Sequence, residues 1–417
     1  MDGSRNSMKR RLWHRMSSTM SNPSQQNLRG LASTRNLQGI LAVGHLANDW
    51  APAAIWLLAP AIGLAFDLQP SQIGLLITLH SVGAALAYLP AGILSDRVQR
   101  PGRLLLFTFW WVGLGYFLAS FAPDFWILAT MLAIAGMGDA TWHPIATGVL
   151  ARRFPARRGL ALGIHALGGT LAEVFSPLVV GILLSVMDWR SALQLSILPP
   201  LIMGVVFYRF RNTIPVSRTS SISRVDLVSL LYSWTTRKGL ALITAITTYN
   251  MALIALMTIS PLFVQRELGY STSETGLFFA LAMLVGATGQ PLVGRWSDRI
   301  GRQRVFVCGL TIASACALLA AVFPYQGWTA GVLIAAMAIL VVIRSGLLAM
   351  AVDYSGKREA TTLGFVFALM DGVGALGALT AGFVGDFELR YGFALAAGFS
   401  LISIGITAVT LNRTSGR

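Results

Sequence analysis

The chain has 417 residues, of which 55% are hydrophobic and only 12% are charged. Soluble domains carry roughly 25% charged residues, so this composition excludes a soluble globular protein. The net charge of +15 would suggest nucleic acid as a partner of a soluble protein, but in a membrane protein the basic residues have to be counted loop by loop.

Long apolar stretches recur along the whole chain. A helix of roughly 20 apolar residues crosses the hydrocarbon core of a bilayer, and lipid offers the backbone of an open chain no other hydrogen-bonded form. The sequence therefore predicts an all-α membrane protein with twelve transmembrane helices, at residues 39–65, 72–94, 104–122, 125–151, 160–187, 191–208, 239–264, 275–295, 305–323, 328–352, 361–386 and 392–411.

The basic residues predict the orientation of these helices. Of the 32 Lys and Arg residues, 28 fall on the side that holds both chain termini, three (Arg190, Arg266 and Arg390) fall on the other side, and Arg344 lies inside a helix. Basic loops stay in the cytoplasm. We therefore expect both termini to be cytoplasmic, a bacterial inner membrane as the location, and no nucleic-acid partner. A mitochondrial transit peptide in the Ser- and Arg-rich tail is the alternative for residues 1–38.

One signature occurs twice. Gly92–Arg103 follows the second predicted helix, Gly294–Arg304 follows the eighth, and their aspartates, Asp96 and Asp298, are 202 residues apart. Internal repeats of this kind are typical of secondary transporters. The predicted organisation is a cytoplasmic tail (1–38), a six-helix bundle (39–208), a polar cytoplasmic linker (209–238), a second six-helix bundle (239–411) and a short cytoplasmic tail (412–417).

The repeated Gly-x-x-x-Asp-Arg-x-Gly-Arg pattern resembles the major facilitator superfamily; the second copy matches it fully, and the first departs from it at Gln99. Within the superfamily, His45–Asp49, Trp142–Pro144, Arg152–Phe154 and Gly168–Gly169 look similar to fosmidomycin-resistance-type exporters. The resemblance implies the major facilitator fold of two pseudo-symmetric six-helix bundles. It also implies that helices 1, 4, 7 and 10 line a central cavity, which alternates between inward-open and outward-open states.

In that fold, the repeated aspartates would contact helix N-termini and arginines of the opposite half only while the cytoplasmic side is closed. We expect Arg152 or Arg153 to pair with Asp96, and Lys357 or Arg358 to pair with Asp298. A solvated basic loop is the alternative, but it does not explain the paired aspartates. The predicted cytoplasmic gate consists of Gly92, Asp96, Arg97, Arg152, Arg153, Gly294, Asp298, Arg299, Lys357 and Arg358.

Charged residues at membrane depth are costly and mark candidate functional sites. Two pairs, His45 with Asp49 and Asp139 with His143, are four residues apart, so each pair shares a helix face. Both histidines and desolvated carboxylates exchange protons in the physiological range, so this pattern favours proton coupling. The alternative is that the histidines satisfy backbone carbonyls. The remaining candidates are Glu173, Arg344 and Asp371.

Arg344 keeps its charge at any accessible pH. It therefore needs a carboxylate, for which Asp371 and Asp139 are the nearest in estimated depth, or an anionic substrate. Aromatic and amide side chains would line the cavity for an amphipathic substrate, although helix packing is an alternative role for them. These residues are Trp50, Trp142, Tyr249 and Asn250.

The sequence holds no nucleophile elbow, no Walker A loop and no metal-ligand motif, so we expect no enzymatic activity, cofactor or metal. The leading hypothesis is a proton-coupled antiporter that exports small amphipathic or drug-like molecules. A proton-linked importer of an organic anion, with Arg344 as its anchor, is the runner-up, and a non-transporting membrane sensor is the third. The expected partners are a small-molecule substrate, protons and the lipid bilayer, and we expect a monomer.

Overall fold

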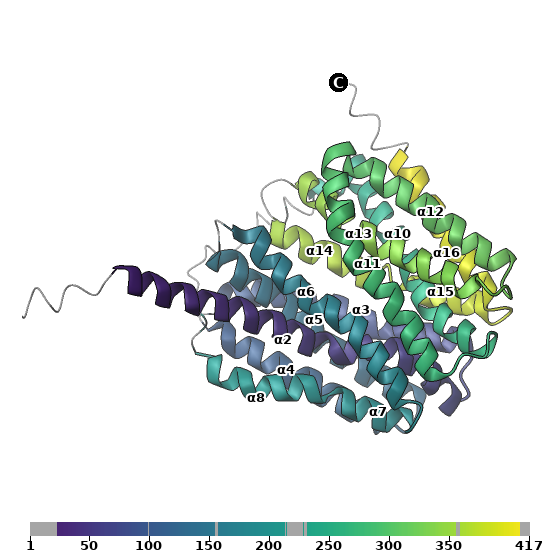
Figure 1. The fold of residues 1–417 in the computed structure, drawn as a ribbon, viewed down its shortest axis with the longest axis horizontal. Coiled ribbons are helices and arrows are strands. Elements are labelled where there is room, and N and C mark those ends of the chain that lie inside the picture. Colours follow the sequence, from purple (N-terminus) through teal and green to yellow (C-terminus); the bar gives the residue numbers. More distant parts are fainter. Residues whose placement is uncertain are drawn as a thin grey trace, which may run out of the picture.

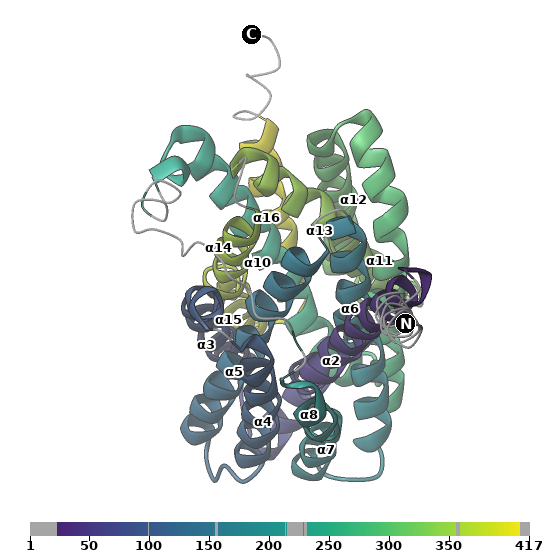
Figure 2. The same ribbon diagram turned by 90° about the vertical axis from the view of Figure 1, so that its left-hand side faces the viewer.

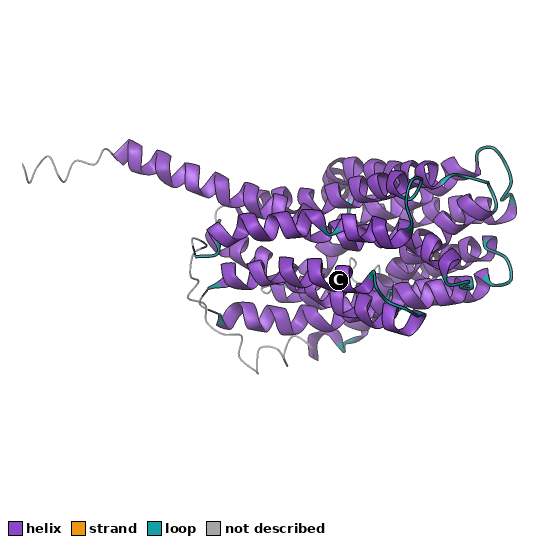
Figure 3. Ribbon diagram, turned by 90° about the horizontal axis from the view of Figure 1, so that it is seen from below, coloured by secondary structure: helices purple, strands orange, loops and turns teal. Residues whose placement is uncertain are grey.

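The computed structural model describes residues 23–98, 100–154, 157–212, 214, 228, 232–355 and 359–408. Within these ranges, the side chains of 23–35, 96–97, 158–159, 355, 359–361 and 363 are not described. In the described residues all regular secondary structure is helical (Figure 3). The predicted linker 209–238 and the two predicted tails lie largely outside these ranges.

The helices fall into two sequential groups. The first group is α2 (Pro23–Ala65), α3 (Pro70–Arg97), α4 (Pro101–Ala119), α5 (Phe125–Arg153), α6 (Arg158–Leu183), α7 (Trp189–Ser196) and α8 (Leu198–Phe210). The second group is α10 (Arg237–Arg266), α11 (Thr272–Ile300), α12 (Arg302–Val322), α13 (Thr329–Ser355), α14 (Glu359–Gly372), α15 (Leu376–Gly385) and α16 (Arg390–Ile406). Helix α2 begins well before residue 39, inside the predicted tail.

Ten described helical stretches are long and apolar enough to cross a membrane. Two of them, Trp189–Phe210 and Gly364–Gly385, each combine two of the helices named above. Helix α16 is apolar but shorter, and α2 is not among the ten; its middle holds the polar segment His45–Asp49. The structure therefore supports a multi-pass helical membrane protein, while the number of twelve spans stays a prediction.

Two of the predicted spans are interrupted rather than continuous. In 191–208, α7 ends at Ser196 and α8 starts at Leu198, directly before two prolines that begin a helix more readily than they continue one. In 361–386, α14 ends at Gly372 and the amides of Val373 and Gly374 both donate to the carbonyl of Leu369. The glycines make this break in the ladder tolerable at membrane depth.

Side chains at the loop ends fix where several helices start. Asp188 caps α7 by accepting from the backbone amides of Arg190 and Ser191, at 2.8 and 3.2 Å. The hydrogen bonds from the hydroxyl and amide of Ser191 lower the pKa of the Asp188 carboxyl. Ser271 and Glu274 form a reciprocal capping box at the start of α11.

The two groups of helices form two halves that pack side by side (Figures 1 and 2). Helix α6 of the first half packs against α11 of the second, and α3 packs against α14 and α15. At the end of the bundle that holds Pro70 and Thr272, which we call the closed end, the halves meet closely. The amide of Ser71 donates to Asp386 across the halves at 2.8 Å, and a Cβ on Gly181 would lie 2.6 Å from the carbonyl oxygen of Thr272.

The opposite end carries the repeated signature, and we call it the arginine-rich end. Arg302 contacts Asp298 at 3.2 Å and also pairs with Asp353, which ties α11, α12 and α13 together. At this end, hydrogen bonds join Arg103 to Asn212 within the first half, and Gln303 to Thr407 and Tyr354 to Ser233 within the second. Hydrogen bonds between the halves are described at the closed end and at mid-depth.

Candidate functional site

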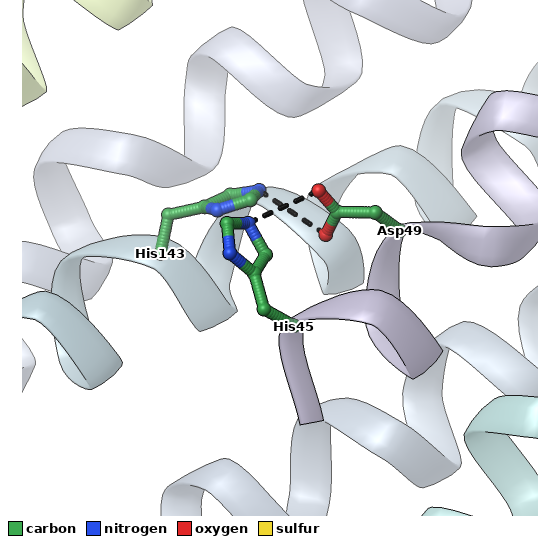
Figure 4. A group of neighbouring side chains, drawn as sticks. All are labelled: His45, Asp49 and His143. Carbon is green, nitrogen blue, oxygen red and sulfur yellow. Dashed lines mark ion pairs between the residues drawn. The ribbon is translucent and has the colours of Figure 1, made fainter. Parts of the chain in front are cut away.

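The two predicted histidine and aspartate pairs come together on α2 and α5. Nε2 of His45 lies 3.1 Å from Oδ2 of Asp49, and Nε2 of His143 lies 3.8 Å from both Oδ1 of Asp49 and Oδ2 of Asp139. Figure 4 shows the two imidazole rings and the Asp49 carboxylate converging on one point. We call His45, Asp49, Asp139 and His143 the central cluster.

The hydrogen bond of His45 to α6 decides which of its nitrogens carries a proton. Nδ1 of His45 lies 2.7 Å from the backbone carbonyl oxygen of His165. A carbonyl oxygen only accepts, so Nδ1 must hold a hydrogen. Nε2 of His45 faces a carboxylate oxygen of Asp49 3.1 Å away, so a base and an acid lie within hydrogen-bond distance of each other.

A third histidine supports this arrangement from α6. The rings of His45 and His165 stack with centroids 4.2 Å apart, and Nδ1 of His165 lies 3.2 Å from the carbonyl oxygen of Leu41. By the same argument, Nδ1 of His165 carries a hydrogen and donates it. Nε2 of His165 is buried and has no hydrogen-bond partner among the described residues. These two hydrogen bonds each join a histidine side chain of one helix to the backbone of the other, and together they hold the His45 ring in place.

The two carboxylates of the central cluster share an amide donor. Asn48 is fully buried, and its side-chain nitrogen donates to Asp139 Oδ1 at 2.5 Å and to Asp49 Oδ1 at 3.3 Å. This places two acidic groups on either side of one neutral residue. Like charges held this close repel each other, so a change at one carboxylate affects the other.

Glycines on α6 make room for the cluster. A Cβ on Gly168 would collide with the backbone carbonyl of Ala42, and a Cβ on Gly169 would lie 2.8 Å from His45 Nε2 and 3.0 Å from Asp49 Oδ2. Real Cβ atoms do not approach other heavy atoms this closely. The Gly168–Gly169 pair, which is part of the resemblance noted in the sequence, lies directly against the central cluster.

Gly169→Ala is expected to push His45 and Asp49 apart. Overpacking of this kind costs about 1–3 kcal/mol, which a large membrane protein tolerates, so the protein should still fold while transport falls sharply. Gly163→Ala on the same helix is the matched control, because a Cβ there meets nothing within 4 Å. Expression, thermal unfolding and transport of both variants should be compared. Equal loss of transport in both variants, or none in either, would contradict this placement.

A hydrogen bond at mid-depth links the cluster's surroundings to the second half. The hydroxyl of Tyr88, on α3, donates to Asp371 Oδ2, on α14, at 2.7 Å. The Tyr88 ring also lies beside His143, with centroids 6.1 Å apart. Tyr88 thus touches both a member of the central cluster and an acid of the other half.

Arg344 pairs with a different acid from the two expected. Its Nη1 lies 3.5 Å from Oε1 of Glu173, which belongs to α6 of the first half. The sequence predicts Asp371 or Asp139 as the partner from estimated depth alone, and that prediction is wrong. Asp371 instead accepts from Tyr88, and Asp139 accepts from Asn48. Neighbouring helices, rather than equal depth, decide the pairing.

The four residues predicted to line a cavity are placed as follows. Trp142 and Tyr249 are fully buried; Trp142 packs against Phe109 at 4.8 Å between ring centroids, and Tyr249 donates to the carbonyl of Leu340. Asn250 is buried and donates to the carbonyl of Met370 at 2.7 Å. Trp50 is half-buried. In this conformation the first three pack between helices.

The predicted gate residues are described only in part. Gly92 is half-buried on α3, Arg152 and Arg153 form the last turn of α5, and Gly294, Asp298 and Arg299 lie on α11. Asp96 and Arg97 end α3, but their side chains lie outside the described set, as do Lys357 and Arg358 altogether. The described partner of Asp298 is Arg302 of the same half, so its expected pairing with Lys357 or Arg358 stays a prediction.

Sequence reasoning did not select three residues that the structure adds: Asn48, Tyr88 and His165. The sequence does contain a signal for Asn48: a polar amide next to an aspartate in an otherwise apolar span indicates a functional site. The roles of Tyr88 and His165 depend on contacts with other helices, which one span does not reveal.

The histidines raise the question of a metal. One atom each of His45, Asp49 and His143 forms a group with separations up to 4.8 Å. Ligand atoms around a tetrahedral zinc ion lie about 3.4 Å apart, given bonds of about 2.0–2.1 Å. As placed, the group is wider than such a centre.

Comparison with known proteins agrees with this helical membrane architecture. The family model of the Major Facilitator Superfamily matches residues 41–362 and 240–416. The chain therefore belongs to this superfamily, and it is a multi-pass membrane transporter rather than an enzyme.

Named relatives cover most of the chain at low identity. A "Putative metabolite transport protein" of Haemophilus influenzae is 25% identical over 85% of this chain and 89% of its own length. The "Fosmidomycin resistance protein" of Escherichia coli is 22% identical over 84% and 86%. A "Probable sugar efflux transporter" of Helicobacter acinonychis is 26% identical over 67% and 70%.

Solved structures share the fold. A bacterial homologue of the human lysosomal transporter Spinster superposes with a TM-score of 0.75 at 18% identity, covering 91% of this chain and 97% of its own. The nucleoside transporter NupG superposes with a TM-score of 0.74 at 11% identity, covering 90% and 99%. At these identities the likeness concerns the fold alone.

Proposed function

We propose that this transporter is a proton-coupled antiporter that exports small amphipathic or drug-like molecules. The observation that carries the proposal is the contact of His45 Nε2 with Asp49 Oδ2 at 3.1 Å, in a cluster that also holds Asp139 and His143. A proton held between a base and an acid in the membrane interior can be exchanged as the site faces each side in turn.

The central cluster has the parts that such a cycle needs. Asp139 and His143 lie next to the His45–Asp49 pair, and Tyr88 connects this region to Asp371 in the second half. A change in the charge of the cluster alters the field at Tyr88, whose hydrogen bond joins the two halves. Proton binding is thereby linked to the relative position of the halves.

The conformation fits a transporter open to the cytoplasm. The positive-inside rule assigns the arginine-rich end to the cytoplasm, and the halves are in close contact at the other end, through Ser71 with Asp386 and Gly181 with Thr272. We accordingly assign this structure to the inward-open state. An exporter takes up its cargo in that state.

Export is favoured over import by two observations. Two relatives carry names that denote efflux or drug resistance. The charge balance at mid-depth is also unfavourable for an anion, because Asp49, Asp139, Glu173 and Asp371 outnumber Arg344. The partial exposure of Arg344 is what supports the runner-up, a proton-linked importer of an organic anion.

Direction and coupling are tested in one experiment. A ligand panel is first scored by thermal shift of the purified protein, since a ligand that binds the folded state raises its melting temperature. Movement of the best ligand is then followed in right-side-out and inside-out vesicles with an imposed proton gradient. Accumulation only in inside-out vesicles, and only with the proton gradient directed outward from their lumen, is the expected result. Gradient-driven accumulation in right-side-out vesicles instead would favour the importer.

The gate is tested by two variants that should change the inward-open fraction in opposite directions. Asp96→Asn should weaken closure of the arginine-rich end and raise the fraction of inward-open protein. Asp386→Ala removes the acceptor for the Ser71 amide at the closed end and should lower that fraction. Labelling of single engineered cysteines at each end reports both populations. Unchanged labelling in the Asp96 variant would mean that this aspartate is not part of a gate.

A further inference from the structure

We propose that Arg344 and Glu173 form the recognition site for a small zwitterion, with the substrate's carboxylate bound by Arg344 and its ammonium group by Glu173. This inference rests on the proposed function, because it names the substrate class of the same transporter. It differs from both hypotheses that the sequence favours, a drug-like molecule of unspecified charge and an organic anion.

The first observation is that a single long contact joins Arg344 and Glu173. Arginine and carboxylate groups that form a permanent ion pair usually make two parallel hydrogen bonds of about 2.7–2.9 Å. Here one contact of 3.5 Å joins Nη1 of Arg344 to Oε1 of Glu173. Among described residues this is the one hydrogen bond that either side chain makes. Most donors of the guanidinium group and one oxygen of the carboxylate are therefore available to a ligand.

The second observation is their exposure. The side chains of Arg344 and Glu173 are 30% and 32% exposed, whereas their chain neighbours Ile343, Ala172 and Val174 are at most 5% exposed. The contact between the two side chains directs both toward the interface of the halves, since α13 belongs to one half and α6 to the other. Both charged groups thus face accessible space between the halves.

The third observation is charge balance. An anion that draws Arg344 away from Glu173 would leave that carboxylate unpaired, close to the other acids at mid-depth. A cation that draws Glu173 away would leave Arg344 unpaired. Unpaired charges at membrane depth are costly. A zwitterion replaces both partners at once and keeps the site neutral, so it is the class of ligand that the pair admits at the lowest electrostatic cost.

A zwitterion bound in this way would connect the two halves of the protein. Glu173 and Arg344 come from opposite halves, so a zwitterion held by both bridges them in place of the direct ion pair. The central cluster on α2 and α5 is composed of other residues, which keeps proton binding and substrate binding on separate side chains.

The test uses three probes that share a benzyl group and differ in charge: L-phenylalanine (zwitterion), 2-phenylethylamine (cation) and N-acetyl-L-phenylalanine (anion), together with the matching tryptophan set. Binding to the full-length purified protein is measured by titration calorimetry at neutral pH without a gradient. In at least one set the zwitterion should bind at least tenfold more tightly than the other two. Arg344→Gln and Glu173→Gln should each weaken zwitterion binding at least tenfold.

Matched controls separate local charge from total charge. Arg266→Gln and Glu267→Gln remove the same two charges from exposed residues at the closed end of α10, and they should leave binding unchanged. Arg344→Lys retains the charge and serves if Arg344→Gln does not fold; it should weaken the carboxylate contact because lysine cannot bind it through two parallel donors. Thermal unfolding of each variant reports folding independently of binding.

The proposal is overturned if no set prefers its zwitterion, absence of binding included, or if the control variants weaken binding as much as the site variants do. Because the assay contains no proton gradient, its result does not depend on proton coupling. A zwitterion that binds but is not moved by a proton gradient would support this site and contradict the proposed function instead.

Discussion

Replacing Asp49 or Asp139 with asparagine is expected to abolish gradient-driven transport while exchange of substrate between the two sides of the membrane continues. Asparagine keeps the size of the side chain but cannot bind and release a proton. In Asp49→Asn the carboxylate beside His45 is lost, and in Asp139→Asn the carboxylate beside His143 and Asn48 is lost. The carrier can then still reorient, but the gradient no longer drives it.

Two rates are measured in reconstituted proteoliposomes: substrate accumulation under a proton gradient, and substrate exchange without one. Asp188→Asn is the control, because asparagine caps a helix about as well as aspartate and Asp188 lies in a loop at the start of α7. His143→Gln should shift the pH optimum rather than remove activity, since His143 lies 3.8 Å from both carboxylates without a short hydrogen bond. If the double asparagine variant still accumulates substrate under an imposed proton gradient, coupling lies at Glu173 or Asp371, or the driving ion is not the proton.

Gly181→Val is expected to keep the closed end from closing and to stop transport. A Cβ on Gly181 would lie 2.6 Å from the Thr272 carbonyl oxygen and 2.9 Å from the Cα of Gly276. Backbone atoms of a packed helix cannot yield as the end of a flexible side chain does. The two halves must then separate at this end, so the variant should populate the outward-open state.

Gly331→Val on α13 is the matched control, because a Cβ there meets nothing within 4 Å and the residue is exposed. Distances between spin labels at the closed end should increase in the Gly181 variant and stay unchanged in the control. Normal transport by Gly181→Val, at normal expression, would show that close contact of α6 with α11 is not needed for the cycle.

Local features of the site were predictable from the sequence, and contacts between helices were not. A spacing of four residues is enough to place His45 beside Asp49 and Asp139 beside His143 on their helices. The carbonyl of His165 that orients His45, and the amide of Asn48 that joins the two aspartates, come into place only through helix packing. Sequence spacing carries no information about which carbonyl a ring nitrogen will meet.

The partner of Arg344 shows the same limit. Counting residues along each span estimates depth, and by depth Asp371 and Asp139 were the better candidates. Pairing also depends on which helices are neighbours and on which face each residue lies, and these placed Glu173 within 3.5 Å. Hydropathy does not show the interruption after Gly372, because it is continuous there; the glycines at 372, 374 and 377 are the sequence signal that marks this stretch as a point of close packing or flexing.

The interruption between α14 and α15 lies beside a hydrogen bond that joins the two halves. The carbonyl of Ala375, just after the interruption, accepts from the amide of Ala378 and also from the hydroxyl of Thr78, on α3 of the other half, at 2.9 Å. A net contribution of about 1 kcal/mol from one such bond favours the conformation that contains it about fivefold. A side chain of one half thus binds the backbone beside a helix break in the other half, which gives the described conformation a small advantage over any in which the halves separate there.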